Sequence, residues 1–313
     1  MANIILTTTP SFSNVVAESD LKDFLKERGI EVCLHNQLSP PFSFDASDVF
    51  GMVAGAAVPV REEALAQFSN LKVIMPFGVG TDHIEDTILK NGSLVRVWPG
   101  INKEAVAELT IAFIFALARN LVTSAETLRA GKWERLCGSD VSGKTLGIIG
   151  LGNIGKEVAK KASALGMRIV ANDIVYDDSF LQSHNIEKAD FETVLQTSDF
   201  LTLHVPLTEA TQNFMNDKTF SLIKRGARFI NTSRGAVVDE KALLRALESG
   251  RVAGAALDVL SLEPPSGDPF ADSTLSRLLA HPRVIAIPHI GSHTSETHYR
   301  VARKICEEMA KTM

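Results

Sequence analysis

A glycine pattern in the middle of the chain limits what this sequence can fold into. The six residues from Gly150 to Gly155 read GLGNIG, directly after the short apolar run Thr145–Ile149 and before a helical pattern over Ile154–Leu165. Glycines at this spacing permit a tight turn, a close approach of the backbone to a ligand and close packing of helix on strand. The pattern therefore predicts a strand, a phosphate-binding turn and a helix, in that order.

Each residue of this turn has its own expected task. Gly150 permits the tight turn, Gly152 lets the backbone approach a pyrophosphate, and Gly155 allows the helix to pack on the strand. Asn153 and Ile154 open the helix, whose free N–H groups and partial positive charge favour phosphates. A glycine pattern alone is weak evidence, because glycines also cluster in turns that bind nothing.

An acidic residue follows at the spacing that a dinucleotide needs. Asp173 comes directly after the next expected strand, Arg168–Asn172, and lies eighteen residues after Gly155. A carboxylate there can bond the ribose 2′-hydroxyl of NAD and repels the 2′-phosphate of NADP, and no arginine occurs in Ile174–Tyr176. The sequence therefore predicts NAD as the cofactor, with a methyltransferase that uses an adenosyl cofactor as the alternative at this point.

Short apolar runs alternate with helical patterns along the whole chain, which predicts parallel sheets flanked by helices. Strands of a first series are expected at Asn3–Leu6, Val32–Leu34, Val49–Ala54 and Val73–Pro76, with helices at Glu18–Arg28 and Glu62–Phe68. Strands of a second series are expected at Thr145–Ile149, Arg168–Asn172, Phe200–His204, Arg228–Asn231, Gly254–Asp258 and Val284–Ile287, with helices at Ile154–Leu165 and Lys241–Glu248 and a last one at Glu296–Ala310. The 313 residues thus predict two doubly wound α/β domains, with the break at Pro99–Asn102.

Composition and charge argue against two classes of partner. The net charge of −5 gives no basic face for nucleic acid. The most apolar segment, Ala105–Leu121, is interrupted by Glu108 and Arg119, and a membrane span needs roughly 20 apolar residues. This segment therefore predicts a buried helix or a subunit interface. The N-terminus has no basic region or long apolar stretch, so a signal peptide is not expected.

The cysteines indicate neither a metal site nor a disulfide framework. Cys33, Cys137 and Cys306 are far apart and form no CxxC pair. We expect three buried free thiols in a reducing cytoplasm.

Arg234, Glu263 and His289 each follow the end of one of the last three expected strands. Singly, each is more often a loop arginine, a solvated acid or a structural histidine than a catalyst. Because ligands bind at the carboxyl ends of strands in open α/β sheets, we expect all three on one rim, beside the dinucleotide turn. Their common position favours a joint chemical function.

These residue types suit the reduction of a 2-oxo acid. Arginine grips a carboxylate with a bidentate fork. Histidine can donate or accept a proton near neutral pH, and a carboxylate bonded to it raises its pKa and orients the ring. The expected assignment is Arg234 on the substrate, His289 as acid or base and Glu263 supporting the histidine.

At this point the chain resembles the D-isomer-specific 2-hydroxyacid dehydrogenase family over nearly its whole length. The stretches that carry the resemblance are PFGVGTDHIED, PGINKEAVAE, GKTLGIIGLGNIGKEVA, LHVPLTEAT, INTSRGAVVDE, AALDV, EPP and PHIGSHT. The resemblance points to the glyoxylate/hydroxypyruvate reductase or phosphoglycerate dehydrogenase-like branch. It implies an NAD-dependent enzyme that transfers a hydride between a small 2-hydroxy acid and its 2-oxo acid.

The family also implies an organisation of the chain. A Rossmann-type cofactor domain would comprise 101–289, and a smaller flavodoxin-like substrate domain would comprise 1–100 and 290–313, with a cleft between them. Members are commonly homodimers joined through the helix that matches Ala105–Leu121. In some relatives the stretch that matches Trp133 and Arg135 reaches a neighbouring subunit's pocket.

The resemblance assigns binding residues as well. The backbone of Val79 and Gly80 would bind the substrate carboxylate together with Arg234 and His289. The nicotinamide amide would lie near Thr232 and Asp258, and the adenine near His204–Pro206. The full set expected at the cofactor is Gly150, Gly152, Asn153, Ile154, Gly155, Asp173, His204, Val205, Pro206, Thr232, Asp258 and Gly291.

Departures from the family pattern bear on the substrate. Phosphoglycerate dehydrogenases often carry arginine where this chain has Ala54 or Val79, and formate dehydrogenases have glutamine at the position of Glu263. Both activities are therefore disfavoured. The segment Pro265–Pro282 is longer than usual and receives no role. Two alternatives stay open: an NAD(H)-sensing corepressor-like binding protein, and a dehydrogenase for phosphite or another unusual substrate.

Overall fold

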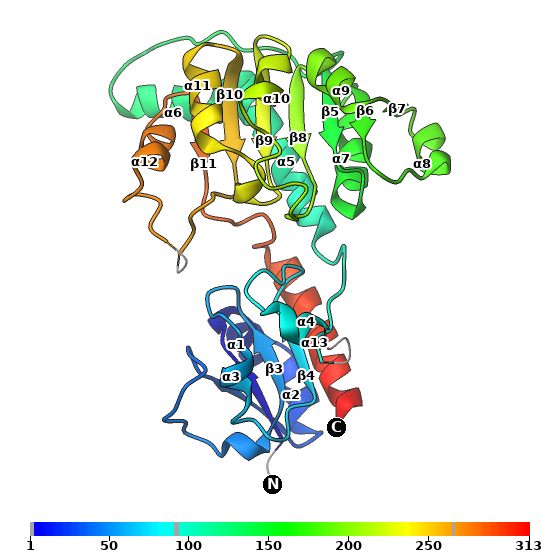
Figure 1. Cartoon of the computed structure of the whole chain (residues 1–313), viewed down its shortest axis with the longest axis vertical. Coiled ribbons are helices and arrows are strands. Elements are labelled where there is room, and N and C mark those ends of the chain that lie inside the picture. The colour runs from blue at the N-terminus through cyan, green and yellow to red at the C-terminus, as the bar shows by residue number, and fades with distance from the viewer. Residues whose placement is uncertain (1–2, 91–93, 265–266) are drawn as a thin grey trace. The chain divides into compact units, whose positions relative to one another are not determined.

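The computed structural model describes residues 3–90, 94–264 and 267–313, which fold into two compact units (Figure 1). The first unit comprises Met1–Asn102 and Ser292–Met313, and the second comprises Lys103–Gly291. Each break lies two residues later than the break expected from the sequence. The C-terminal helix, α13 (Ser295–Thr312), belongs to the first unit although the whole second unit precedes it in the chain.

The first unit contains a four-stranded parallel sheet in the order β2-β1-β3-β4. Its strands are β1 (Asn3–Thr7), β2 (Ile30–Leu34), β3 (Val49–Ala54) and β4 (Val73–Pro76). One face packs against α1 (Pro10–Ala17), α2 (Leu21–Lys26) and α13, and the other against α3 (Glu62–Leu65) and α4 (Asp86–Lys90). The strand order is that of a flavodoxin-like sheet.

The second unit contains a seven-stranded parallel sheet in the order β11-β10-β9-β8-β5-β6-β7. Its strands are β5 (Thr145–Ile149), β6 (Arg168–Asn172), β7 (Glu187–Lys188), β8 (Phe200–Leu203), β9 (Ala227–Asn231), β10 (Val252–Leu257) and β11 (Val284–Ala286). The chain leaves β5 for β6 on one side and returns to β8 on the other. This reversal creates the switch point at which doubly wound sheets bind dinucleotides.

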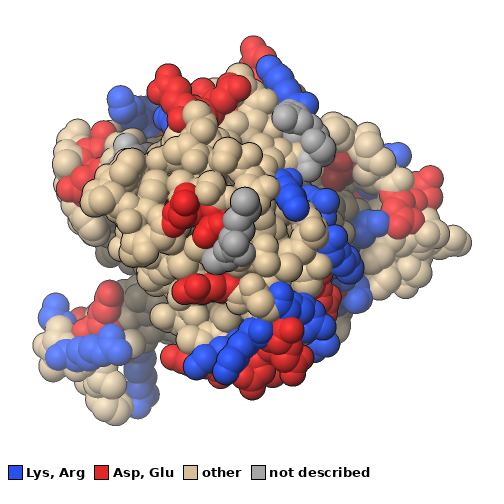
Figure 2. Space-filling model, turned by 90° about the horizontal axis from the view of Figure 1, so that it is seen from below, with Lys and Arg blue, Asp and Glu red and all other residues tan. Residues whose placement is uncertain are grey.

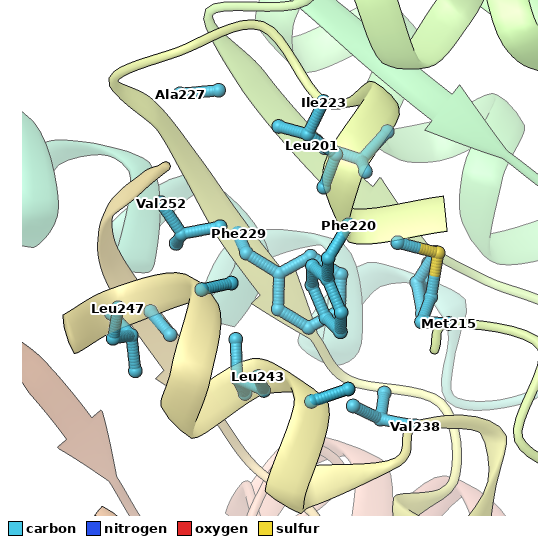
Figure 3. Close-up of a cluster of buried hydrophobic side chains, with 14 of the residues drawn as sticks. Leu201, Met215, Phe220, Ile223, Ala227, Phe229, Val238, Leu243, Leu247 and Val252 are labelled. Atoms are coloured by element: carbon cyan, nitrogen blue, oxygen red, sulfur yellow. The ribbon is translucent and has the colours of Figure 1, made fainter. Parts of the chain in front are cut away.

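Helices cover both faces of the larger sheet (Figure 1). On one face lie α5 (Lys103–Arg119) and α7 (Asn153–Ala164), and on the other α9 (Phe191–Thr197), α10 (Asp217–Leu222), α11 (Glu240–Glu248) and α12 (Ser273–Leu279). Near this second face the rings of Phe220 and Phe229 meet edge to face at 5.4 Å, among the apolar side chains of Figure 3. Leu181 of α8 (Asp178–Ser183) and Val237 of the 3-10 turn η2 (Gly235–Val237) also pack into the cores of this unit, whereas α6 (Leu121–Arg129) has no buried residue. Another 3-10 turn, η1 (Ala46–Asp48), belongs to the first unit.

The two-domain parallel α/β architecture is confirmed, but several local predictions are wrong. The helix expected at Glu18–Arg28 is present but shorter, as α2, and a helix that was not expected, α1, precedes it. Pro10 occupies the first turn of α1, where its missing N–H costs nothing, and Phe12 and Val16 are buried at helical spacing. A seventh strand, β7, was not predicted because its two residues, Glu187 and Lys188, carry no apolar pattern and form an exposed edge.

The expectation of three buried thiols is also wrong. Cys306 is buried on α13, whereas Cys33 is half-buried and Cys137 is exposed. Burial raises the pKa of the Cys306 thiol to about 12, so this group stays protonated.

Two surface features complete the description. On the face shown in Figure 2, basic and acidic side chains lie interspersed. Across the described ranges, no single helix is long and apolar enough to cross a membrane, although α5 and α6, bent by 61°, pass that test when taken together.

Candidate active site

The glycine turn after β5 adopts the geometry that a close-lying ligand requires. Gly150 has φ +94°, and a Cβ there would lie 2.6 Å from the carbonyl oxygen of His204. A Cβ on Gly155 would overlap the carbonyl oxygen of Gly150, so the start of α7 packs directly on the turn. At Gly152, in contrast, no atom lies within 4 Å of the Cβ position. The turn is therefore closed at its base and open at Gly152, where a phosphate would approach.

The N-terminus of α7 suits an anion. Gly152 is its N-cap residue and supplies no side-chain acceptor, and no acidic residue occupies the first turn. The first N–H groups of a helix have no intrahelical partner and carry partial positive charge. The residues present thus fit a pyrophosphate over Gly152, Asn153 and Ile154.

Asp173, which follows β6, contacts the glycine turn through its carboxylate. Its carboxylate accepts hydrogen bonds from the N–H of Leu151 and, at 3.1 Å, from the N–H of Val175. These bonds hold the carboxylate beside the glycine turn, where it can also accept from a ribose hydroxyl. The neighbouring Ile174 is 98% exposed, which is unusual for an apolar side chain and suits a surface that a flat base covers.

His204 lies on the opposite side of Gly150 and is held by two threonines. Its Nε2 lies 3.1 Å from Oγ1 of Thr202, and its Nδ1 lies 3.5 Å from Oγ1 of Thr232. Burial lowers the pKa of His204 to about 3, so its ring is neutral near neutral pH. Val205, the next residue, is half-buried with its Cγ1 beside Gly150, whereas Pro206 is exposed.

The structure brings Glu263 and His289 into direct contact within the second unit. Nδ1 of His289 lies 2.7 Å from Oε2 of Glu263, and the N–H of Leu260 donates to Oε1 at 2.9 Å. The two side chains, His289 and Glu263, are 45% and 33% exposed, so the pair remains accessible to a substrate. With Nδ1 bonded to the carboxylate, Nε2 is the nitrogen that can exchange a proton with a ligand.

The contact raises the pKa of His289 and lowers the pKa of Glu263. The hydrogen bond that His289 donates to Glu263 raises the pKa of His289; burial opposes this, and the charges of Glu263 and Asp258 add to it. Burial would raise the pKa of Glu263, but the bond and charge of His289, the Leu260 N–H and the charge of Arg234 together lower it. His289 is therefore stabilised as a proton donor.

Asp258 holds the turn on which His289 lies. This buried residue, 2% exposed, accepts from the N–H groups of Ile290 at 2.7 Å and Gly291 at 3.0 Å. Its carbonyl accepts from the N–H of His289 at 2.8 Å. His289 has φ +51°, a conformation uncommon for residues other than glycine and typical of functional turns.

Arg234 immediately precedes η2, at the end of the neighbouring strand β9. The buried side chain of Asn231 fixes its backbone: Nδ2 donates to the Arg234 carbonyl at 2.9 Å, and Oδ1 accepts from the N–H and hydroxyl of Ser233. The charge of Arg234 acts to lower the pKa of both Glu263 and His289, so the three side chains form one electrostatic group. Sequence reasoning missed Asn231, although its place at the end of a strand, three residues before Arg234, is the signal that could have found it.

The remaining predicted residues, Val79 and Gly80, lie in the first unit, in the loop that follows β4. Arg234, Glu263, His289 and the whole predicted cofactor set lie in the second.

Comparison with known proteins decides the family. Residues 111–291 match the model of the NAD binding domain of D-isomer specific 2-hydroxyacid dehydrogenases. The chain belongs to this family. The expectations of this family and of NAD as its cofactor are confirmed, and the methyltransferase alternative is set aside.

Relatives with different activities resemble the chain to similar degrees. It is 39% identical to the hydroxypyruvate reductase of Thermotoga maritima over 84% of each chain. It is 36% identical to the D-3-phosphoglycerate dehydrogenase of Pongo abelii over 91% of its own length and 52% of the relative's. The chain thus spans about half the length of the phosphoglycerate dehydrogenases it matches.

Solved structures match nearly the whole chain. The TT0316 protein of Thermus thermophilus aligns with a TM-score of 0.82 at 32% identity, covering 99% of this chain and 96% of that one. The D-lactate dehydrogenase of Aquifex aeolicus, solved with NAD and lactic acid, aligns with a TM-score of 0.81 at 27% identity, covering 98% and 94%.

Proposed function

We propose that the protein reduces a small, unphosphorylated 2-oxo acid with NADH and catalyses the reverse oxidation of the D-2-hydroxy acid. The observation that carries this proposal is the 2.7 Å contact between Nδ1 of His289 and Oε2 of Glu263. The charge of Arg234 acts on the pKa of both residues. All three residues follow strands of the sheet that carries the glycine turn. A proton donor, His289, and a cation, Arg234, therefore belong to the same sheet as the proposed dinucleotide site.

Each side chain has a defined task in this proposal. When bound, NADH supplies the hydride that reduces the substrate carbonyl. The guanidinium of Arg234 binds the substrate carboxylate. Protonated His289 donates its Nε2 proton to the developing alkoxide, and Glu263 stabilises the imidazolium beforehand. In the oxidation direction neutral His289 takes the hydroxyl proton. The backbone of Val79 and Gly80 would contribute to carboxylate binding.

The first unit favours an unphosphorylated substrate. Ligands of parallel sheets bind at the carboxyl ends of the strands. The segments that follow β1 to β4, residues 8–9, 35–45, 55–60 and 77–85, contain no lysine or arginine; after β3 the next such residue is Arg61, the N-cap residue of α3. A phosphate is normally bound by cationic side chains. Glyoxylate and hydroxypyruvate therefore fit better than phosphohydroxypyruvate.

NADH oxidation at 340 nm against a panel of acids tests the function. The panel contains glyoxylate, hydroxypyruvate, pyruvate, phosphohydroxypyruvate and a branched 2-oxo acid. We expect turnover of an unphosphorylated acid, with kcat/KM for phosphohydroxypyruvate at least about 100-fold below that for hydroxypyruvate. No turnover of any acid together with normal NADH binding would instead favour the sensing role or an unusual substrate such as phosphite.

Replacing Glu263 by glutamine tests the support of the histidine. The hydrogen bond and charge of Glu263 raise the pKa of His289, and reduction needs the protonated ring. Activity is therefore present below this pKa and is lost as the pH rises through it. In Glu263→Gln the pKa of His289 falls, so the descending limb of kcat/KM for reduction moves to lower pH, by about one unit. An unmoved limb would contradict the coupling of the two residues.

Replacing Asp173 by alanine tests the choice of cofactor. The carboxylate beside the glycine turn is proposed to bond the ribose 2′-hydroxyl and to repel a 2′-phosphate. In Asp173→Ala we expect the preference for NADH over NADPH to fall by about 10- to 100-fold, measured as the ratio of kcat/KM values. An equal loss with both cofactors would show that Asp173 acts only through Leu151 and the shape of the turn.

Homodimerisation is proposed together with the activity. The segment after α5 exposes several large apolar side chains close together in the sequence, namely Leu121, Val122, Leu128, Trp133 and Leu136. Exposed apolar side chains that gather on one surface mark interaction sites. We propose that a second copy covers it, and that Trp133 and Arg135 approach that copy.

A further inference from the structure

Glu240 makes contacts that its place on a helix does not explain. It is the first residue of α11, whose free N–H groups at Lys241 and Ala242 are already capped by the side chain of Asp239. The carboxylate of Glu240 binds Ser261 instead: Oε1 accepts from its N–H at 2.8 Å, and Oε2 accepts from its hydroxyl. Both carboxylate oxygens of Glu240 thus accept hydrogen bonds from the loop that contains Ser261, outside the helix.

That loop carries Glu263. The N–H of Leu260, the neighbour of Ser261, donates to Oε1 of Glu263 at 2.9 Å, and Oε2 of Glu263 faces His289. The loop also lies against the segment of Arg234, because a Cβ on Gly235 would overlap the carbonyl group of Leu260. Glu240 therefore binds Ser261 at the place where the loop of Glu263 lies against the segment of Arg234.

The surroundings of Glu240 make the two bonds from Ser261 important to its carboxylate. Burial raises the pKa of its carboxyl group and the charges of Asp272 and Asp239 add to the effect, whereas the two hydrogen bonds from Ser261 oppose it. A partly buried carboxylate among acidic neighbours is unfavourable unless donors satisfy it. In the described part of the chain these donors come from Ser261, so movement of the loop would remove the donors that satisfy the carboxylate.

We propose that Glu240 is a positioning residue: by binding Ser261 it fixes the loop on which Glu263 meets His289. The proposal rests on the function proposed above, since that function gives the Glu263–His289 pair its purpose. Glu240 acts on the pair through Ser261. Its loss lets the loop relax and lengthens the contact between Glu263 and His289.

The direct test follows His289 without any substrate. The Cε1–H resonances of the eight histidines are titrated by NMR, and His289 is assigned by the peak that disappears in His289→Gln. In Glu240→Ala we expect the pKa of His289 to fall by about half a unit, because Glu263 is displaced while Asp258 and Arg234 still face the ring. The descending limb of kcat/KM for reduction should move by the same amount, with kcat/KM about tenfold lower and the Kd of NADH unchanged.

Two further variants separate positioning from general stability. Ser261→Ala removes one of the two bonds at an exposed position and should lower the pKa of His289 less than Glu240→Ala does. The double variant should show no more than the shift of Glu240→Ala alone, since both changes remove one interaction. Glu192→Ala is the matched control: it removes an exposed glutamate from the first turn of α9 and should leave the titration unchanged.

The outcomes are decisive in either direction. A shift in Glu240→Ala and Ser261→Ala, absent in Glu192→Ala, supports the positioning role. An unshifted His289 in folded Glu240→Ala overturns it, and if that variant does not fold, Ser261→Ala decides in the same way. If the wild-type protein reduces no 2-oxo acid, the proposed function fails, while the titration still decides whether Glu240 positions the pair.

Discussion

Replacing His289 by alanine is expected to lower kcat for 2-oxo acid reduction by about 10³-fold while the Kd of NADH changes by less than about twofold. The size follows from the loss of a positioned general acid, which contributes about 10² to 10⁴ in rate. The selectivity follows from geometry, because the ring bonds to Glu263, which follows β10, whereas the glycine turn follows β5. Stopped-flow kinetics and fluorescence titration of NADH measure the two quantities.

Two additional variants make this result interpretable. His289 has φ +51°, so alanine adds backbone strain, whereas asparagine tolerates this conformation. His289→Asn should therefore lose the same activity with a smaller loss of stability. His281→Ala, at the opposite end of β11, should retain activity. A parallel loss of NADH binding in His289→Asn would mean that the histidine is structural.

The pH dependence of the wild-type enzyme should report on His289 rather than on His204, the histidine beside the cofactor turn. Burial lowers the pKa of His204 to about 3, so it does not change charge in the working range.

Replacing Arg234 by alanine is expected to lower kcat/KM for the 2-oxo acid by about 10³-fold, chiefly through KM. A bidentate, charge-assisted contact to a carboxylate is lost, and such contacts are worth several kcal/mol in partly buried sites. Arg234→Lys should recover only a small part, because an ammonium group cannot form the planar fork. Steady-state kinetics with the best acid of the panel measures both variants.

The expected shift of the pKa of His289 in Arg234→Ala is opposite in direction to the shift in Glu263→Gln. The charge of Arg234 acts to lower the pKa of His289, so its removal should move the descending limb of the reduction profile to higher pH. Arg277→Ala, which breaks an exposed ion pair with Glu248, is the matched control and should leave kcat/KM unchanged. Full activity in Arg234→Ala would exclude substrate binding by this residue.

Much of the fold was predictable because parallel strands carry a local signature. Runs such as Thr145–Ile149 and Val49–Ala54 are buried on both faces and therefore read as continuous apolar segments, and the structure places strands at these same residues. Where this signal is weak, prediction failed: the two-residue strand β7 is polar and lies at the sheet edge. Helix α1 was not predicted because it begins with a proline, a residue that usually ends helical patterns but is tolerated in the first turn.

The sequence by itself determined the glycine turn and the residue types that follow each strand. Turn chemistry is local: Gly150 needs a positive φ, and Gly155 has no room for a Cβ. The positions of Arg234, Glu263 and His289 after successive strands also predicted a common rim, because parallel strands end at the same edge of a sheet.

Only the tertiary structure decided how these side chains are held. The bonds of Asp258 to the turn of His289 and of Glu240 to Ser261 join residues 21 to 33 positions apart. No periodicity encodes such pairs, since they depend on which loops the packed helices bring together. The same holds for α13, which packs on α1 and α2 of the first unit: its amphipathic face requires a partner, but the sequence does not specify which one.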